Sequence, residues 1–457
     1  MRKIIQYMMM ALIAVVLASC ANDINEESTP TVKSNIHFVV DDFPMFEKPS
    51  TRTIGEEDMG KTAWAVGDEI CVKLTSKELG TQTAILKYNG VKFENQDGNS
   101  LCYLEGDPVT AYAYYAPNRR WINGSLEVKD FNLKGTAEFL EATCTVHNGD
   151  KNYVDISFAN ATRNYSRLRI ATIPKTEIKV DADNFAPTDH PNSLYMTYTL
   201  TSDEKGNAYL YGTFYNNSIV TVKYRGVTLK TYPFSKETEN AKSYALDATV
   251  ISANSAEEIK SAIEQKLADG KPDIRLNLTS NAGDNEFKAI GEAFEYVEDG
   301  TIDLTLIGCK EIPTDGLTNI MALKSISLPD VTKIGMNAFS YCMYLQEICA
   351  PNVSAIDERA FAGCTCLEKV TLGELTDVRG EANSGVGIFD DTDNLTRYIE
   401  LYLPQNQEVM KGEFDENSYQ YIWKPTGERY FASPDSGMGL FLGYQFRLVR
   451  VGDDNIH

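Results

Sequence analysis

Histidine is scarce in this sequence, and basic residues are outnumbered by acidic ones. The histidines are His37, His147, His190 and His457, which leaves little material for a multi-histidine zinc site or for catalysis that rests on several imidazoles. Lysine and arginine number 43 against 65 aspartates and glutamates, so the formal net charge is −22. Nucleic acids and anionic membranes are bound by basic faces, so this charge argues against both as partners of the protein surface.

Common enzyme motifs are also lacking. No GxSxG, HExxH or GxGxxG pattern occurs, and no phosphate-binding loop stands out. The run Asp390-Asp391-Thr392-Asp393-Asn394 offers oxygen ligands for calcium, but the glycine and distal glutamate of an EF-hand are missing, which favours a solvated acidic loop. Paired carboxylates for glycoside cleavage stay open, because such partners meet only in the fold. The sequence therefore predicts a protein that is not an enzyme, with no cofactor and no metal.

The N-terminus has the features of an export signal. Arg2-Lys3 precedes an apolar run over residues 7–18, which is shorter than the ~20 residues that a membrane-spanning helix needs. The run ends in Leu17-Ala18-Ser19-Cys20, which resembles the signal of bacterial lipoproteins. The resemblance implies cleavage before Cys20 and lipidation of this cysteine. An ordinary secretory signal is the alternative.

The residues after Cys20 are polar, acidic and proline-containing, which is typical of an extended tether. Acidic residues directly after the lipidated cysteine are similar to the surface-export signal of Bacteroidetes lipoproteins. This similarity implies an exported, lipid-anchored protein of the outer membrane, displayed on the cell surface. The other eight cysteines are spread along the chain without a CxxC pair, so we expect no dense disulfide framework.

Between about residues 34 and 250 the sequence predicts short strands separated by turns. Valine, isoleucine and tyrosine recur at period two between polar breaks, which is typical of antiparallel sheets packed as a β-sandwich. The clearest runs are 36–40, 69–74, 111–115, 153–158, 167–170 and 218–224. The stretch is long for one sandwich and comfortable for two.

Several segments in this part carry a family resemblance. Thr51-Arg52-Thr53, Trp64-Ala65-Val66-Gly67-Asp68-Glu69-Ile70 and Ala113-Tyr114-Tyr115-Ala116-Pro117 resemble the N-terminal region of fimbrillin-like proteins, and residues 153–170 are similar to the segment that follows. The resemblance implies two transthyretin-like β-sandwich domains in a surface or fimbrial protein. By itself, Trp64 beside the turn pair Gly67-Asp68 is best explained as a core aromatic.

Arg52 occupies the place where a protease can cut fimbrillins near the first strand and open a groove for a strand donated by a neighbour. Strand donation is physically plausible because main-chain hydrogen bonds supply generic affinity. A solvated loop arginine is the simpler explanation. Some 200 further residues follow the fimbrillin-like part, so its last strand is not a free end. An anchor or tip subunit is therefore favoured over a stalk subunit.

Apolar residues recur every 22 residues in the C-terminal half. A single coil is too small to bury its own apolar side chains. When coils stack, the equivalent side chains of successive coils lie above one another and form buried columns. We expect the core of these repeats to contain Leu323, Ile326, Leu328, Phe339, Leu345, Ile348, Phe361, Leu367, Val370 and Leu372. About nine extra residues around 379–394 interrupt the next copy. Upstream, Ser255-Ala256-Glu257-Glu258 predicts a helix through Leu267, and residues 287–297 have helical spacing.

The repeat, Leu-x-x-Ile-x-Leu-Pro-x-Val-x-x-Ile-x-x-x-Ala-Phe-x-x-Cys in its first clear copy, resembles the BspA-type leucine-rich repeat over residues 300–405. The resemblance implies a surface adhesin or host-interaction module. Cys342 and Cys364 share one repeat position, which allows a disulfide or metal role, although a ladder of buried small side chains is favoured. The aromatic strand pattern of residues 411–457 predicts a cover for the open end of the repeats.

We therefore expect a mostly β fold, with two transthyretin-like β-sandwiches followed by an α/β-capped leucine-rich repeat solenoid. The expected division is a signal peptide (1–19), a lipidated tether (20–33), sandwich one (34–148), sandwich two (149–250), the repeat domain with its helical cap (251–410) and a β cap (411–457).

The predicted function is adhesion to a protein or glycan on a host, matrix or neighbouring bacterial surface, through the exposed strand face and the insertion loop of the solenoid. One alternative is a fimbrial anchor or tip subunit that contacts other fimbrial subunits. Another is a carbohydrate-capture surface lipoprotein whose tyrosines and tryptophans stack on sugars.

Overall fold

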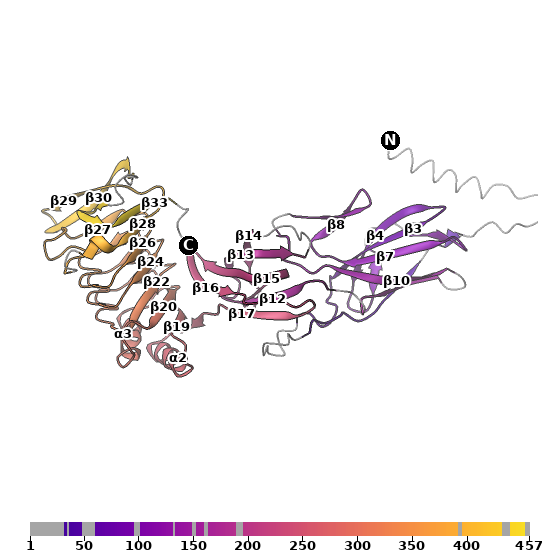
Figure 1. The fold of residues 1–457 in the computed structure, drawn as a ribbon, viewed down its shortest axis with the longest axis horizontal. Helices are drawn as coiled ribbons and strands as arrows, with labels where there is room; N and C mark the ends of the chain where they lie inside the picture. Colours follow the sequence, from indigo (N-terminus) through magenta and orange to yellow (C-terminus); the bar gives the residue numbers. More distant parts are fainter. Residues whose placement is uncertain are drawn as a thin grey trace, which may run out of the picture. The chain divides into compact units, whose positions relative to one another are not determined.

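A computed structural model describes residues 32–33, 36–47, 60–95, 101–130, 133–148, 152–159, 163–188, 195–391, 395–431 and 439–452. Cys20 and Arg52, the expected lipidation and cleavage sites, lie outside these residues. The chain divides into two compact units. The first comprises Met1–Pro44, Lys61–Glu127 and Phe139–Thr162, and the second comprises Met45–Gly60, Val128–Glu138 and Arg163–His457. The described part is mostly β, as the sequence predicts (Figure 1).

The first unit is built on a seven-stranded sheet of order β2-β11-β10-β7-β3-β4-β5. Neighbouring strands are antiparallel except β2 and β11, which run parallel. The strands are β2 (His37–Val40), β3 (Glu69–Ser76), β4 (Gly80–Tyr88), β5 (Phe93–Asn95), β7 (Val109–Tyr115), β10 (Leu140–Asn148) and β11 (Asn152–Ser157). Two short pairs accompany the sheet, β1 (Val32–Lys33) with β6 (Tyr103–Leu104) and β8 (Arg119–Ile122) with β9 (Ser125–Val128).

Trp64 lies at the centre of the aromatic core of the first unit. Its ring meets Phe43, Phe93 and Tyr115 edge-on, with centroid separations of 4.9, 5.0 and 5.3 Å. The indole Nε1 donates a hydrogen bond of 2.7 Å to the carbonyl of Asp41. The only polar atom of this side chain is therefore satisfied inside an apolar cluster, which is the condition under which tryptophan is stable in a core. The interpretation of Trp64 as a core residue agrees with these contacts.

Sheet membership extends beyond the boundary expected between residues 148 and 149. This boundary falls in the turn of the β10–β11 hairpin, where Asn148 pairs with Asn152. Both strands therefore belong to the first sheet, and the first unit continues to Thr162. Period-two alternation identifies a strand but not the neighbour with which it pairs, so the sequence alone could not assign β11 to its sheet.

The second unit begins with a six-stranded sheet of order β14-β13-β15-β12-β17, with β16 also paired to β15. Only β12 and β17 run parallel among these described pairs. The strands are β12 (Ser166–Ala171), β13 (Glu177–Pro187), β14 (Tyr195–Thr201), β15 (Asn207–Tyr224), β16 (Val227–Pro233) and β17 (Ser243–Asp247). The expected strand over 218–224 is only the second half of β15, because Asn216 and Asn217 interrupt the apolar alternation while the backbone continues.

The repeats form two sheets, and each regular coil contributes one strand to each of them. The strands of the regular coils run parallel in both sheets. The larger sheet has the order β18-β19-β20-β22-β24-β26-β28-β33. Its strands are β18 (Ile251–Ser252), β19 (Asp273–Asn277), β20 (Ile302–Ile307), β22 (Leu323–Ser327), β24 (Glu347–Ala350), β26 (Lys369–Leu372), β28 (Glu400–Leu403) and β33 (Leu448–Val451). Figure 1 shows these strands side by side in chain order from β19 to β28. The segment 411–457 supplies β33, which extends the sheet by one parallel strand.

The smaller sheet has the order β21-β23-β25-β27-β30-β29. Its strands are β21 (Glu311–Ile312), β23 (Lys333–Ile334), β25 (Ala355–Ile356), β27 (Asp377–Arg379), β30 (Gln420–Arg429) and β29 (Glu408–Asp415). The first four are parallel, and the β29–β30 hairpin adds two antiparallel strands. The remaining elements near this end are η3 (Leu395–Tyr398) and the pair β31 (Gly439–Phe441) and β32 (Tyr444–Phe446).

Two helices precede the repeats. Helix α2 (Ala256–Ala268) begins after Ser255, whose side chain accepts a hydrogen bond from the Glu258 amide, as the sequence predicts. Helix α3 spans Asp284–Ala293 rather than the expected 287–297. Apolar spacing marks the side that faces the core and not the ends of the helix, which here starts where the Glu286 carboxylate accepts from the Gly283 amide at 2.9 Å. No helix within the described ranges has the length and apolar character required to cross a membrane.

Candidate functional site

The side chains of the repeats form buried columns. The parallel register places Ile326 beside Ile348 and Ile348 beside Val370, and all three side chains are fully buried. Phe339 and Phe361 stack with ring centroids 5.8 Å apart. Every expected core residue is buried: Leu323, Ile326, Leu328, Phe339, Leu345, Ile348, Phe361, Leu367, Val370 and Leu372. These columns fix the spacing and register of the strands, and therefore of the side chains on the opposite side of each strand.

The outward side of the larger sheet carries two rows of polar side chains. Strand residues alternate between faces, so the residues flanking each buried isoleucine, leucine or valine point away from the core. One row contains Asp303, Ser325, Glu347, Lys369 and Glu400, which are neighbours in the register. The other row contains Thr305, Ser327, Cys349, Thr371, Tyr402 and Arg450. We call these two rows the strand face.

Ion pairs and hydrogen bonds connect neighbouring strands within the strand face. Lys369 Nζ lies 2.9 Å from a carboxylate oxygen of Glu347 on the next strand, and Ser325 Oγ donates to Asp303 at 2.6 Å. Burial opposes the charge on Lys369, but the hydrogen bond and the charge of Glu347 outweigh it and raise the pKa of the lysine. Tyr402 OH donates to Glu400 at 2.7 Å. The strand face is therefore an ordered polar array. Thr305 and Thr371 are buried in it, and its central residues line a hollow of about 560 Å³ that β13, β15 and β16 border on the other side.

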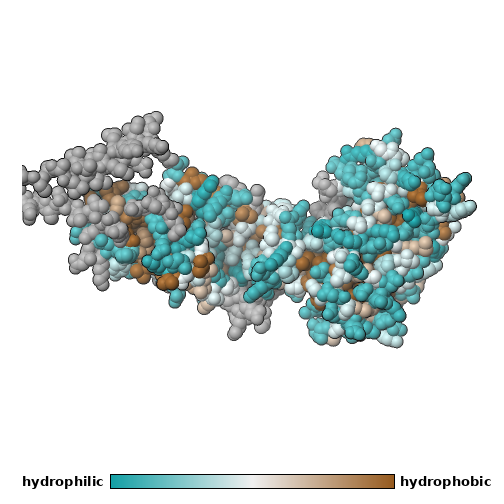
Figure 2. All heavy atoms as spheres, turned by 180° about the vertical axis from the view of Figure 1, so that it is seen from behind, coloured by the Kyte–Doolittle hydropathy of each residue, from teal (hydrophilic) through white to brown (hydrophobic). Residues whose placement is uncertain are grey.

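The outward side of the smaller sheet has a similar ladder of charges. Lys333 Nζ lies 2.7 Å from Glu311 and 3.6 Å from Asp357, and Arg379 Nε lies 3.4 Å from Asp357. The hydrogen bond with Glu311 raises the pKa of Lys333. The pair Glu311–Lys333 thus matches the pair Glu347–Lys369 in chemistry and spacing. Figure 2 shows that hydrophilic side chains cover most of the visible face of the repeat region.

The cysteines that share a repeat position are buried thiols. The Sγ atoms of Cys342 and Cys364 donate hydrogen bonds of 3.0 and 3.1 Å to the carbonyls of Leu317 and Phe339. Both cysteines are free, and burial raises the pKa of Cys342 to about 12 and that of Cys364 well above its usual value. These contacts agree with a ladder of small buried side chains rather than a disulfide. Among the described residues no cluster of histidine, cysteine or carboxylate groups could hold a metal ion.

Asp390 differs from the expectation of a solvated acidic loop. The side chain is 6% exposed and accepts hydrogen bonds from the amides of Asn383, Gly385 and Gly387 at 2.9, 2.7 and 2.9 Å. Tyr444 OH donates to it at 2.7 Å. Asp390 therefore organises the insertion by accepting hydrogen bonds from its backbone amides. Residues 392–394 lie outside the described ranges. A run of acidic residues in the sequence does not reveal such burial, because the hydrogen-bond donors to Asp390 are mainly backbone amides.

Tyr341, Arg359 and Asp391 form a cluster on the turns between the two sheets. Arg359 donates to Asp391 at 2.8 Å and to the Tyr341 hydroxyl at 3.1 Å, and Tyr341 donates to Asp391 at 3.2 Å. The hydrogen bond from Arg359 lowers the pKa of Asp391. All three residues have positive φ, from 57° to 59°. Sequence reasoning missed this cluster because its members belong to different coils and Asp391 falls in the insertion.

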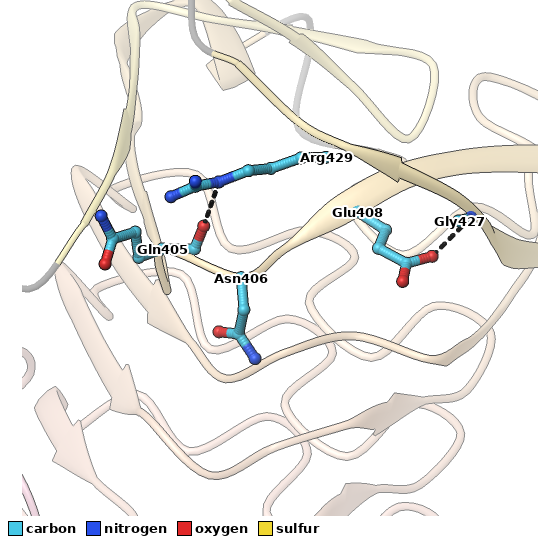
Figure 3. A pocket seen from close by; sticks show the side chains of 5 residues that line it. All are labelled: Gln405, Asn406, Glu408, Gly427 and Arg429. Carbon is cyan, nitrogen blue, oxygen red and sulfur yellow. Dashed lines mark hydrogen bonds between the residues drawn. The ribbon is translucent and has the colours of Figure 1, made fainter.

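A polar hollow of about 570 Å³ lies at the base of the β29–β30 hairpin and is lined by five residues (Figure 3). Arg429 Nε donates to the Gln405 carbonyl at 2.8 Å, and the Gly427 amide donates to Glu408 at 2.6 Å. Asn406 also hydrogen-bonds to Glu374. The charged groups are thus engaged with neighbouring protein groups, and the lining contains no nucleophile or general base in a catalytic arrangement.

Residues 55–62 have the spacing of a phosphate-binding loop, GxxxxGK[ST], contrary to the expectation from the sequence. Residues 55–59 lie outside the described ranges. The lysine of this pattern, Lys61, is paired with Asp68, and its Nζ lies 4.9 to 5.6 Å from the ring centroids of Phe43, Trp64 and Tyr115. Turns and then β3 follow, where a phosphate loop requires a helix. The match is therefore one of spacing only.

Comparison with known proteins identifies the repeats. Residues 278–399 match the BspA type leucine rich repeat region in six copies. This range begins before residue 300, where the sequence period is first clear. No curated protein matches the chain.

Two solved structures are similar to parts of the chain. A proposed cell adhesion protein from Bacteroides fragilis is 10% identical, with a TM-score of 0.23, over 47% of this chain and 92% of that one. The fimbrial anchor protein Mfa2 from Porphyromonas gingivalis is 12% identical, with a TM-score of 0.21, over 44% of this chain and 82% of that one. At these TM-scores the alignments establish no shared fold. What the comparisons establish is that residues 278–399 of this chain are a BspA-type leucine-rich repeat region.

Proposed function

We propose that this protein is an outer-membrane lipoprotein that adheres to another surface through its repeats. In this proposal a lipid on Cys20 holds the chain, two transthyretin-like β-sandwiches follow, and the repeats form a solenoid that carries the binding surface. The partner is a protein or a glycan on a host, a matrix or a neighbouring bacterium. The protein acts by binding and not by catalysis.

The strand face is the observation that carries this proposal. Its polar side chains come from consecutive coils held in register by the buried columns, so they form one ordered array that runs along the larger sheet and into the hollow beside β13, β15 and β16. Extended repeat surfaces of this kind suit large partners because each coil adds contacts without a new scaffold. A formal net charge of −22 favours partners that are neutral or basic.

Exchanging the two members of one ion pair tests the proposal. The double variant E347K/K369E keeps an ion pair between β24 and β26 but inverts its direction on the strand face. We expect it to fold normally and to bind less tightly, because the charges opposite the partner are reversed while the strand pairing is retained. Binding of the full chain to immobilised matrix proteins, host cells and bacterial cells gives the readout.

The smaller sheet supplies the matched control. The double variant E311K/K333E makes the same exchange between β21 and β23, on the other sheet and in the coils that precede β24 and β26. The proposal requires this variant to bind as the unaltered chain does. If E311K/K333E loses binding and E347K/K369E retains it, the partner does not engage the strand face.

A second candidate function is supported by the segment before Arg52. Strand β2 lies at the edge of its sheet, parallel to β11, and Asp41 accepts hydrogen bonds from the Phe158 amide and the Ser157 hydroxyl at 2.9 and 2.5 Å. Phe43 is buried beside Trp64. Removal of this segment would expose the β11 edge and an apolar cavity, which is the groove that a donated strand needs. These contacts favour a fimbrial anchor or tip subunit.

Treatment of the full chain with an arginine-specific protease tests this second function. Cleavage after Arg52, followed by loss of the N-terminal fragment and pairing with a donor strand, is the expected result. If the chain is not cut there, or if the cut fragment stays bound and no assembly forms, this protein does not join fimbriae by strand donation. The R52K variant, which retains the charge and removes the cleavage site, is the control.

A further inference from the structure

The hairpin that ends the smaller sheet leaves one strand at an open edge. Strand β29 (Glu408–Asp415) pairs with β30 on one side, and no strand of the described ranges pairs with its other side (Figure 1). The strand is eight residues long and contains no proline. An open edge of this length presents unpaired amide and carbonyl groups that can pair with another strand.

The sequence of β29 is complementary to itself around Gly412. If two copies of this strand pair antiparallel with Gly412 opposite Gly412, Lys411 of each copy lies opposite Glu413 of the other. In the same register Met410 lies opposite Phe414. Opposite charges and apolar side chains that face each other across strands stabilise a sheet. Both contacts occur twice, because the arrangement has a two-fold axis.

Within the chain, Lys411 and Glu413 have no oppositely charged neighbour across the described hairpin. In the hairpin Lys411 lies directly opposite Lys424, and Glu413 lies opposite Ile422. Both Lys411 and Glu413 are exposed, and neither forms an ion pair with another described residue. A like charge opposite Lys411 is unfavourable within the sheet. A carboxylate supplied across the open edge would compensate for it.

The apolar side chains near the end of β29 are also exposed. Phe414 is 57% exposed and Tyr419, in the hairpin loop, is 83% exposed; their ring centroids are 6.5 Å apart. At Gly412 a Cβ would lie 2.4 Å from a ring carbon of Tyr421, so the Tyr421 ring covers this position and a glycine is required there. The centre of the strand is therefore the small residue Gly412. The charged residues Lys411 and Glu413 flank it, and the aromatic Phe414 follows.

We propose that the outer edge of β29 is a self-association surface, at which two copies of this chain join their smaller sheets antiparallel about Gly412. The pair of Lys411 with Glu413 of the second copy sets the register, and the exposed Phe414 of each copy lies against the strand of the other at Met410, whose side chain is buried in its own repeat core. The interface is small compared with that of a stable dimer, so the association is weak in solution. It becomes effective where many copies are held at one surface, because tethering raises their effective concentration.

Single and combined charge reversals test the register. K411E places Glu opposite Glu, and E413K places Lys opposite Lys, so each variant alone should self-associate roughly tenfold more weakly than the unaltered chain. The two variants mixed in equal amounts should recover the association, because every reversed charge then faces its opposite in the mixed dimer. Sedimentation equilibrium of the full chain at concentrations up to about 0.5 mM gives the readout.

Matched reversals elsewhere control for net charge. K271E and E295K change the same residue types at exposed positions outside the edge, and we expect them to leave the association unchanged. Thermal melts establish that each variant folds. The proposal is overturned if the unaltered chain stays monomeric throughout this range, if K411E and E413K associate as the unaltered chain does, or if their mixture associates no better than either variant alone.

Discussion

Asp390 shows how much a single side chain can do in the repeat insertion. Its carboxylate is almost fully buried and accepts hydrogen bonds from three backbone amides and from one tyrosine hydroxyl. The insertion is therefore shaped by a charge that replaces the hydrogen bonds of a regular coil. An aspartate followed by further acidic residues is typical of solvated loops, and nothing in the local sequence distinguishes this one.

We predict that D390A destabilises the protein by about 3 kcal/mol. Hydrogen bonds to a charged group contribute roughly 1.5–3 kcal/mol each, and the amides that remain are left without an acceptor in a buried site. Urea denaturation gives the free energy of unfolding. The neighbouring variant D391A, which removes a pair with the partly exposed Arg359, should cost less than about 1 kcal/mol. Equal losses for the two variants would contradict the role assigned to Asp390.

The cysteines respond differently to pH and to alkylation. Burial raises the pKa of Cys342 to about 12, so this thiol stays protonated at pH 8 in the folded protein, whereas Cys366 is exposed. We expect iodoacetamide to label Cys366 and to leave the buried Cys342 and Cys364 unlabelled until the chain unfolds. Mass spectrometry of the peptides provides the readout. Labelling of Cys342 in the folded protein would show that its column is open.

The raised pKa of Cys342 also determines how the free energy of unfolding changes at alkaline pH. A thiol whose pKa is raised by folding stabilises the folded state fully below its unfolded value of about 8.5. This contribution is lost as the pH rises from there toward about 12, because the unfolded chain ionises first. The free energy of unfolding should therefore fall between pH 8.5 and 12.

At the scale of elements, the phenylalanine column joins the regular coils to the insertion. Phe361 stacks on Phe339 on one side and on Phe389 on the other, with centroids 5.8 and 5.3 Å apart. Phe389 lies in the insertion, so the interrupted copy still supplies its ring to the column. Tyr444 and Phe446 meet Phe389 edge-on and end the column.

We predict that F361A destabilises the protein by about 3–5 kcal/mol. Removal of a fully buried ring from the middle of a stack leaves a cavity that its neighbours cannot fill. F414A, at the exposed end of β29, removes the same ring and should change the free energy of unfolding by less than about 0.5 kcal/mol. Urea denaturation of both variants compares them. A small loss for F361A would mean that the column can collapse around the gap.

The elements differ in how far the sequence predicts them. The repeats were predictable residue by residue because one period acts on every coil and the same positions are buried each time. The strand runs near residues 69–74, 111–115 and 153–158 were also predictable, since alternation is a local signal. Sheet membership, the length of β15 and the contacts of Asp390 were not, because they depend on partners that are distant in the sequence.

At the scale of the whole molecule, the described residues combine a strand-rich part with a repeat region that has a larger and a smaller sheet. Pairs such as Glu347–Lys369 and Glu311–Lys333 join opposite charges on neighbouring strands. Surface pairs of this kind contribute little to stability. In the proposed function their arrangement in register matters for recognition instead, because it holds the charges in a fixed pattern.

The proposed adhesive function depends most on where the partner contacts the repeats, and hydroxyl-radical footprinting of the full chain measures this directly. Oxidation of Tyr402 and Cys349 reports on the strand face, and oxidation of Tyr341 and Tyr344 reports on the turns between the sheets. With a bound partner we predict protection of Tyr402 and Cys349 and unchanged oxidation of Tyr341 and Tyr344. Protection of the turn tyrosines with Tyr402 and Cys349 unprotected would contradict the account.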